Sequence, residues 1–155
     1  MPEETIEETA RAIAAEHGNR PDELLEILHA VQGALGYVPE AAVPALANAL
    51  NLSRAEVHGV VTFYHDFRAK PAGRHVLKLC RAEACQSMGG EALVERAEDH
   101  LGVACGSTSA DGAVTLEATY CLGLCATAPS AMIDGRLIGR MTASRLDALL
   151  KEAGA

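Results

Sequence analysis

Hydrophobic residues in the first half of the chain recur at the spacing of amphipathic helices. From Thr5 to about Phe67 they fall three and four positions apart, in runs separated by Gly, Pro and Asn. Such runs are typical of helices that bury one face. The pattern predicts a bundle of four short helices, over residues 6–16, 21–35, 40–50 and 54–63.

Individual residues predict how these helices begin and pack. Pro21 suits the first turn of the second helix, where no free backbone N–H is needed. Ser53 precedes the fourth helix and Glu56 follows three residues later, which is the spacing of a capping box. The second helix is expected to bury an apolar stripe formed by Leu24, Leu25, Ile27, Leu28, Val31 and Leu35.

The pattern changes after residues 70–73, where Lys-Pro-Ala-Gly interrupts the helical spacing. Gly135-Arg136 is expected to form a hairpin turn, and Thr142 is expected to cap a final helix that buries its leucines. The order β-α-β-β-β-α predicts an α+β fold, with a helical bundle at residues 1–70 and a sheet domain at residues 74–155. Its expected strands are residues 75–79, 113–119, 131–134 and 137–140, and its first helix is residues 90–101.

Charge and composition argue against nucleic acid and membrane partners. The formal net charge of −8 repels phosphate backbones and anionic lipid surfaces, and aromatic residues, at 3%, are too few for base stacking. No segment approaches the roughly 20 apolar residues of a membrane span, and residues 1–18 lack the features of a secretory signal. We therefore expect a cytoplasmic protein with no direct membrane contact, whose partner is another protein or a small carrier.

Four of the five cysteines form two local pairs. Cys80 and Cys85 make a C-x4-C pair after the first predicted strand, and Cys121 and Cys125 make a C-x3-C pair after the second. Thiols stay reduced in the cytosol, so these residues are better explained as metal ligands or redox groups than as structural disulfides. Loops that leave the same edge of neighbouring strands come together, so four thiolates can meet at one site. Cys105 lies outside both pairs and is expected to be a packing or surface thiol.

Several kinds of site fit this spacing. A [2Fe–2S] cluster takes two thiolates on each iron, so two local pairs match its shape. The glycines of residues 87–90 and 122–124 would let backbone N–H groups approach the sulfurs, and the helix that starts near Gly90 would point its positive end toward Cys85. A structural zinc site with four cysteines stays an alternative. A disulfide redox module, for which the C-x-x-C spacing is missing, and unliganded core cysteines fit less well.

Motifs for catalysis by the chain itself are missing from the sequence. There is no G-x-G-x-x-G after a strand, no P-loop, and no Ser-His-Asp or Cys-His pattern in a nucleophile context. The sequence therefore predicts a non-catalytic redox subunit or, in another functional class, a docking module that zinc or a cluster stabilises without any redox role.

Longer segments resemble a known family. The sequences GYVPEAA at 36–42, VHGVVTFYHDF at 57–67 and YCLGLCATAPSAMID at 120–134, together with the paired cysteines, are similar to the small [2Fe–2S] subunit of NADH-quinone oxidoreductase and its soluble relatives. Those relatives include NAD-dependent formate dehydrogenases and NAD-reducing hydrogenases. The loop at residues 80–90, CRAEACQSMGG, most resembles the gamma subunit of the molybdenum-containing, NAD-dependent formate dehydrogenases.

The resemblance implies a fold, ligands and partners. It implies a thioredoxin-like fold for residues 74–155 and one [2Fe–2S] cluster on Cys80, Cys85, Cys121 and Cys125. It also implies a flavin- and NAD-binding partner subunit and, through that subunit, a molybdenum-containing catalytic subunit. FMN, NAD, further Fe–S clusters and the molybdenum cofactor are expected only in those partners. Ala128-Pro129 occupies the place where thioredoxin-like folds often have a cis proline.

Overall fold

The structure is a computed structural model that describes residues 2–155. The chain divides into two compact units, of which the first ends at Pro71 and the second begins at Ala72, and each has a hydrophobic core of its own. Whether residues 1–70 and 74–155 are independent domains, as the sequence predicts, stays a prediction. Among residues 2–155, no helix has the length and apolar character needed to cross a membrane.

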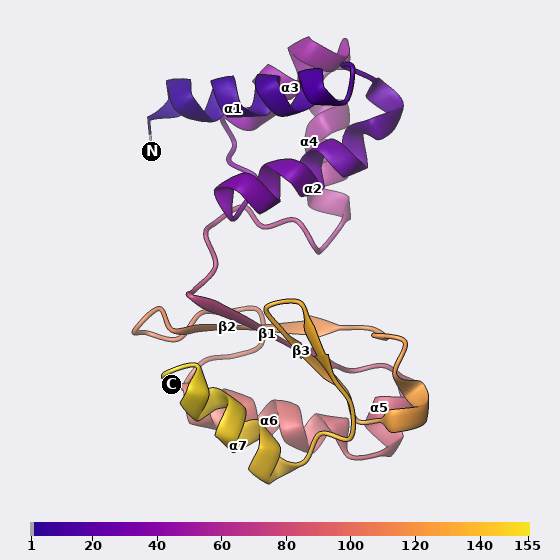
Figure 1. The fold of residues 1–155 in the computed structure, drawn as a ribbon, viewed down its shortest axis with the longest axis vertical. Coiled ribbons are helices and arrows are strands. Elements are labelled where there is room, and N and C mark those ends of the chain that lie inside the picture. The colour runs from indigo at the N-terminus through magenta and orange to yellow at the C-terminus, as the bar shows by residue number, and fades with distance from the viewer. Residues whose placement is uncertain (1) are drawn as a thin grey trace. The chain divides into compact units, whose positions relative to one another are not determined.

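Helices form the first unit. In residues 2–71 these are α1 (Glu3–Glu16), α2 (Leu24–Leu35), α3 (Ala42–Leu50) and α4 (Arg54–Phe63), which pack around one core (Figure 1). The short 3-10 helix η1 (Pro21–Glu23) precedes α2, so Pro21 occupies the first helical turn as predicted. Leu25 does not belong to the buried stripe, because it is 38% exposed. Adjacent helical residues point about 100° apart, and Leu24 takes the inward position.

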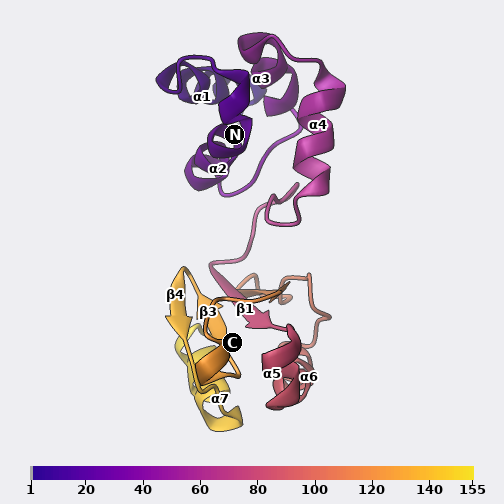
Figure 2. The same ribbon diagram turned by 90° about the vertical axis from the view of Figure 1, so that its right-hand side faces the viewer.

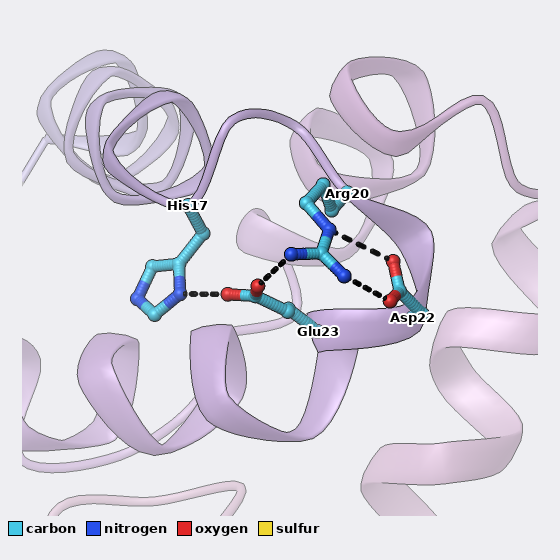
Figure 3. Close-up of polar contacts among 4 residues, drawn as sticks. All are labelled: His17, Arg20, Asp22 and Glu23. Carbon is cyan, nitrogen blue, oxygen red and sulfur yellow. Dashed lines mark hydrogen bonds and ion pairs between the residues drawn. The ribbon is translucent and has the colours of Figure 1, made fainter.

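Polar side chains tie the end of α1 to the start of α2. Nδ1 of His17 lies 2.7 Å from Oε2 of Glu23, and Nη1 of Arg20 lies 2.9 Å from Oε1 of the same carboxylate (Figure 3). Arg20 also pairs with Asp22. Arg20 and Asp22 are exposed and His17 and Glu23 are only part-buried, so water competes for these groups. The contacts therefore fix the geometry of the turn more than they stabilise the fold.

Both predicted helix caps are confirmed. The Ser53 hydroxyl accepts the N–H of Glu56 at 3.2 Å, and Oε2 of Glu56 accepts the N–H of Ser53 at 2.8 Å, which completes the capping box of α4. Thr142 accepts the N–H of Arg145 at 3.3 Å and caps α7 (Ala143–Glu152). As expected, α7 buries its leucines, at positions 146, 149 and 150.

A four-stranded sheet organises the second unit. In the order β2 (Val114–Thr119), β1 (His75–Cys80), β3 (Ala131–Ile133) and β4 (Arg136–Ile138), β1 and β2 are parallel and the other neighbours antiparallel. The helix α6 (Gly90–Leu101) connects β1 to β2, and α6 and α7 cover the same face of the sheet (Figures 1 and 2). The predicted α+β order is confirmed, and the parallel pairing places the ends of β1 and β2 at one edge.

The hairpin turn lies one residue earlier than expected. Asp134 and Gly135 have φ angles of 49° and 83°, whereas Arg136 pairs with Ile133 in the β3–β4 ladder. A two-residue turn with positive φ at both positions matches the twist of the flanking strands and favours Asp-Gly. The predicted turn at Gly135-Arg136 was therefore wrong, because Asp134 was assigned to the preceding strand and not to the turn.

The capping box of α4 makes a stability prediction. Ser53→Ala removes the side-chain acceptor for the N–H of Glu56, and we expect it to lower the free energy of unfolding by about 1 kcal/mol. Urea unfolding followed by circular dichroism at 222 nm measures the change. Ser53→Thr keeps a hydroxyl and should lose much less, so equal losses in the two variants would contradict this account of the cap.

Candidate metal centre

Cys80 and Cys121 are brought together by the parallel pairing of β1 and β2. Cys80 is the last residue of β1 and stands opposite Thr119, the last residue of β2, with Cys121 two residues beyond. Cys121 has a φ of 84°, a left-handed conformation in which its N–H donates to Sγ of Cys80 at 3.3 Å. The structure therefore joins the two cysteine loops at the edge where both strands end.

The short helix α5 (Glu83–Ser87) carries Cys85, and no pattern in the sequence predicts it. It has only five residues, fewer than a periodic pattern needs to be recognised. The Gln86 side chain donates to the carbonyl of Arg81 at 2.9 Å, and the guanidinium of Arg81 makes a two-pronged pair with Glu91 of α6, at 3.0 and 2.7 Å. These contacts fix the loop between Cys80 and Cys85.

The second pair lies on the turn after β2. Cys125 begins the 3-10 helix η2 (Cys125–Thr127), and its Sγ is 3.5 Å from Sγ of Cys121. Two thiolates on one tetrahedral metal, at the metal–sulfur distance of about 2.3 Å known from zinc sites, lie about 3.8 Å apart. The observed separation is thus close to that of two ligands on one metal, and all five cysteines are free thiols.

The two pairs differ in exposure. Cys80 and Cys85 are 3% and 2% exposed, whereas Cys121 and Cys125 are exposed to solvent. A group bound by all four sulfurs would have one buried side and one side at the surface. Cys105 packs against the core of the second unit, as expected for a packing thiol, and burial raises its pKa.

The surroundings lower the pKa of the Cys80 thiol and raise that of the Cys125 thiol. Burial alone would raise the pKa of Cys80, but hydrogen bonds from the N–H groups of Ala82 and Cys121, with contributions from the side chains of Cys85 and Ser130, bring it below its usual value. For Cys125 the neighbouring sulfur of Cys121 raises the pKa, because the protonated thiol can hydrogen-bond to that sulfur and because two thiolates this close repel each other. A metal cation that binds both sulfurs removes that repulsion, since thiolates bind metals in deprotonated form.

The expected backbone N–H donors to sulfur are found at residues 122–124 but not at residues 87–90. The N–H of Gly123 donates to Sγ of Cys121 at 3.4 Å, which confirms the expected role of residues 122–124. In the first loop, the N–H groups of Met88 and Gly89 bond to the carbonyls of Cys85 and Gln86, so the prediction that they would approach sulfur was wrong. They close the last turn of α5, a helix that the sequence did not indicate.

Ser130 is a further residue at the site that sequence reasoning missed. It is 3% exposed, its hydroxyl lies 3.4 Å from Sγ of Cys85, and its carbonyl accepts the N–H of Cys80 at 3.1 Å. It directly follows the Ala128–Pro129 bond, which is cis as predicted. A serine fifty residues from Cys80 carries no local signal of this contact, which depends on the antiparallel pairing of β1 and β3.

The arrangement of the cysteines in two pairs fits a cluster with two metal ions. Among residues 2–155, no three His, Cys, Asp or Glu side chains are grouped to hold one metal ion. A [2Fe–2S] cluster does not need such a group, because each iron takes only two thiolates and the bridging sulfides complete its coordination. One buried pair and one exposed pair, joined by the Cys121–Cys80 hydrogen bond, fit that requirement.

Comparison with known proteins relates the chain to one family. The model of the thioredoxin-like [2Fe–2S] ferredoxin family matches residues 10–154. A subunit of the NADH-quinone oxidoreductase of Pseudomonas aeruginosa is 40% identical over 110 residues, which cover 71% of this chain and 66% of that protein. The corresponding NADH-quinone oxidoreductase subunit of Rhizobium meliloti is 36% identical over 147 residues, which cover 95% and 88%.

A solved structure shows the same fold. The crystal structure of an NAD+-reducing [NiFe]-hydrogenase in the air-oxidised state is similar with a TM-score of 0.73 and 29% sequence identity. The match covers 85% of this chain and 23% of the hydrogenase chain. The present chain thus spans about a quarter of that protein and about two thirds of the Pseudomonas relative.

Gly90, at the start of α6, allows the first cysteine loop to pack closely. A Cβ on this residue would lie 2.7 Å from the carbonyl oxygen of Cys85 and 3.3 Å from that of Cys80. We expect Gly90→Ala to push the Cys85 backbone away and to lower the free energy of unfolding by about 1–3 kcal/mol, as overpacking does. Urea unfolding followed by circular dichroism measures the loss.

Gly59→Ala is the matched control for this prediction. Gly59 also lies in a helix, but a Cβ there would meet no atom within 4 Å. We expect that change to stabilise the chain by about 0.5–1 kcal/mol, since glycine is unfavourable inside a helix. A Gly90→Ala variant as stable as Gly59→Ala would show that the close contact with Cys85 is not needed.

Proposed function

The chain belongs to the thioredoxin-like [2Fe–2S] ferredoxin family, and we propose a specific role for it within that family. In this proposal it is the electron-transfer subunit of a cytoplasmic NAD-dependent formate dehydrogenase. Its cofactor is one [2Fe–2S] cluster, which takes up and gives back single electrons. The ligands in this proposal are Cys80, Cys85, Cys121 and Cys125. The observation that carries it is the meeting of two cysteine pairs at the common edge of β1 and β2.

The chain's own residues would bind and orient the cluster. Cys80 and Cys85 hold its buried side, and Cys121 and Cys125 hold the side nearest solvent. The N–H groups of Cys121 and Gly123 donate toward sulfur and stabilise the negative charge there. The exposed pair offers the shorter route for an electron to a partner, because less protein separates it from the surface.

The partner assignment rests on the resemblance of the loop at residues 80–90 to formate dehydrogenase gamma subunits. In this proposal a flavin- and NAD-binding subunit contacts the chain, and a molybdenum-containing subunit oxidises formate beyond it. FMN, NAD, the molybdenum cofactor and the other Fe–S clusters belong to those partners, and this chain has no catalytic residue of its own.

A second candidate is the equivalent subunit of an NADH-quinone oxidoreductase or an NAD-reducing hydrogenase. The names of the similar proteins favour it, since they include NADH-quinone oxidoreductase subunits of two bacteria and, among solved structures, the NAD+-reducing hydrogenase. It shares the cluster and the four cysteines with the first candidate and differs only in the complex that surrounds the chain.

Cysteine substitution tests the four ligands. In Cys80→Ser, Cys85→Ser, Cys121→Ser and Cys125→Ser we expect the cluster to be lost or perturbed, because serine replaces a thiolate ligand. Visible absorption, iron and acid-labile sulfide content, and the EPR signal of the reduced chain measure the loss. Cys105→Ser is the control and should keep all three signals, since Cys105 packs against the core.

The opposite pattern, with Cys105 essential and one of the four dispensable, would refute the ligand assignment. A chain that contains zinc and no iron, and gives no EPR signal on reduction, would instead indicate the third possibility, a docking module without redox function.

Purification of the tagged chain from its native cell, at its natural expression level, tests the parent complex. We expect molybdenum, flavin and NAD-dependent formate oxidation to co-purify with it. Quinone reduction by NADH without molybdenum would replace the formate dehydrogenase assignment with the respiratory one, and nickel with hydrogen oxidation would replace it with the hydrogenase. The tag expressed without the chain in the same cell is the control for the tag and should recover none of these partners.

A further inference from the structure

Ser130 presents a buried hydroxyl to the buried half of the proposed cluster site. Its Oγ lies 3.4 Å from Sγ of Cys85, and the serine and the cysteine are 3% and 2% exposed. Bulk water therefore does not compete for either atom. Ser130 is not one of the four proposed ligands, and its side chain has no role in binding the cluster in the proposed function.

The position of Ser130 is fixed by the sheet. Its carbonyl accepts the N–H of Cys80 at 3.1 Å, and the next residue, Ala131, pairs with Leu79 of β1. The main chain of Ser130 is thus held against the first cysteine loop by the β1–β3 ladder, which keeps its side chain beside Cys85. A polar group held in this way needs little rearrangement to interact with a charge on sulfur.

Binding of iron decides which atom donates in the Ser130–Cys85 contact. Between a thiol and a hydroxyl either atom can be the donor. A cysteine bound to iron is a thiolate, which has no proton and can only accept. In this contact only the Ser130 hydroxyl can then donate, and the bond that it gives to Sγ of Cys85 is a charge-assisted hydrogen bond.

We propose that Ser130 is a positioning residue that raises the reduction potential of the cluster by donating this hydrogen bond. The inference rests on the proposed function, since it needs the cluster to be bound. One electron enters on reduction and no bond to Ser130 forms or breaks. The added negative charge spreads onto the sulfurs, and a donor aimed at one of them favours the reduced form.

Burial makes this hydrogen bond electrostatically stronger than one from a donor at the surface. Cys85 belongs to the buried pair, where charges are screened less than at the exposed pair. The backbone donors described above act on Cys80 and Cys121, so the Ser130 hydroxyl supplies a donor to Cys85. Loss of the hydroxyl should therefore shift the potential without removing any ligand.

Two pairs of variants isolate the hydroxyl. The first pair is wild type and Ser130→Ala, which differ in the hydroxyl. The second pair is Ser130→Thr and Ser130→Val, which have the same shape, but only the Thr variant has a hydroxyl. In the full chain with its cluster, the midpoint potential is measured by redox titration followed by EPR. We expect Ala to lie below wild type and Val below Thr, each by about tenfold in the equilibrium constant for reduction, or about 59 mV for one electron.

Ser109→Ala is the matched control. Ser109 is also a buried serine of this unit, but its hydroxyl donates to Asp111 and accepts the N–H of Val114, at the far end of β2 from the cysteines. Val114 and Thr119 are five residue steps apart along β2, a distance of about 16 Å. We expect the potential of Ser109→Ala to equal that of wild type.

The outcomes separate this inference from the function on which it rests. Equal potentials within both pairs, in variants with full iron and sulfide content, would overturn the role of Ser130 and leave the proposed function intact. Loss of the cluster from the Ala and Val variants, with retention in Thr, would also overturn it, because Ser130 would then serve assembly. A wild-type chain without iron and acid-labile sulfide would refute the proposed function itself.

Discussion

The parallel pairing of β1 and β2 is the constraint on which the site depends. Because the two strands run in the same direction and end opposite each other, Cys80 and Thr119 share one edge of the sheet, and the loops that follow must meet there. The hydrogen bond from Cys121 to the sulfur of Cys80 is a direct result. An antiparallel arrangement of the same strands would have placed the two cysteine pairs at opposite edges.

The remaining elements of the second unit hold this edge in place. The helix α6 connects the parallel strands and covers one face of the sheet together with α7 (Figure 1). It contacts the first cysteine loop through Gly90 and through the pairing of Glu91 with Arg81. On the other side of β1, the strand β3 brings Ser130 to Cys80 and Cys85. The two cysteine loops are thus fixed by regular secondary structure, which limits how much they would rearrange if a cofactor bound there or changed its charge.

Exposure divides the four cysteines into a buried pair and a pair at the surface. The first cysteine pair lies in the interior with its hydrogen-bond donors, where packing keeps the sulfurs in position. Weak screening there makes each hydrogen bond electrostatically stronger. The second pair lies on a turn at the surface. In an electron-transfer protein this asymmetry is useful, because a carrier must both protect its cofactor from solvent and bring it within reach of a partner.

Much of the fold was determined by the sequence alone, because it depends on local rules. The helix caps, the helix periods and the boundaries of α6 follow from neighbouring residues, and so does the pairing of cysteines along the chain. Only the tertiary structure decided the details of the site. The helix α5 has too few residues for a periodic pattern to indicate it. The left-handed backbone of Cys121 and the contact of Ser130 with Cys85 depend on strands distant in sequence, and no local pattern encodes such long-range contacts.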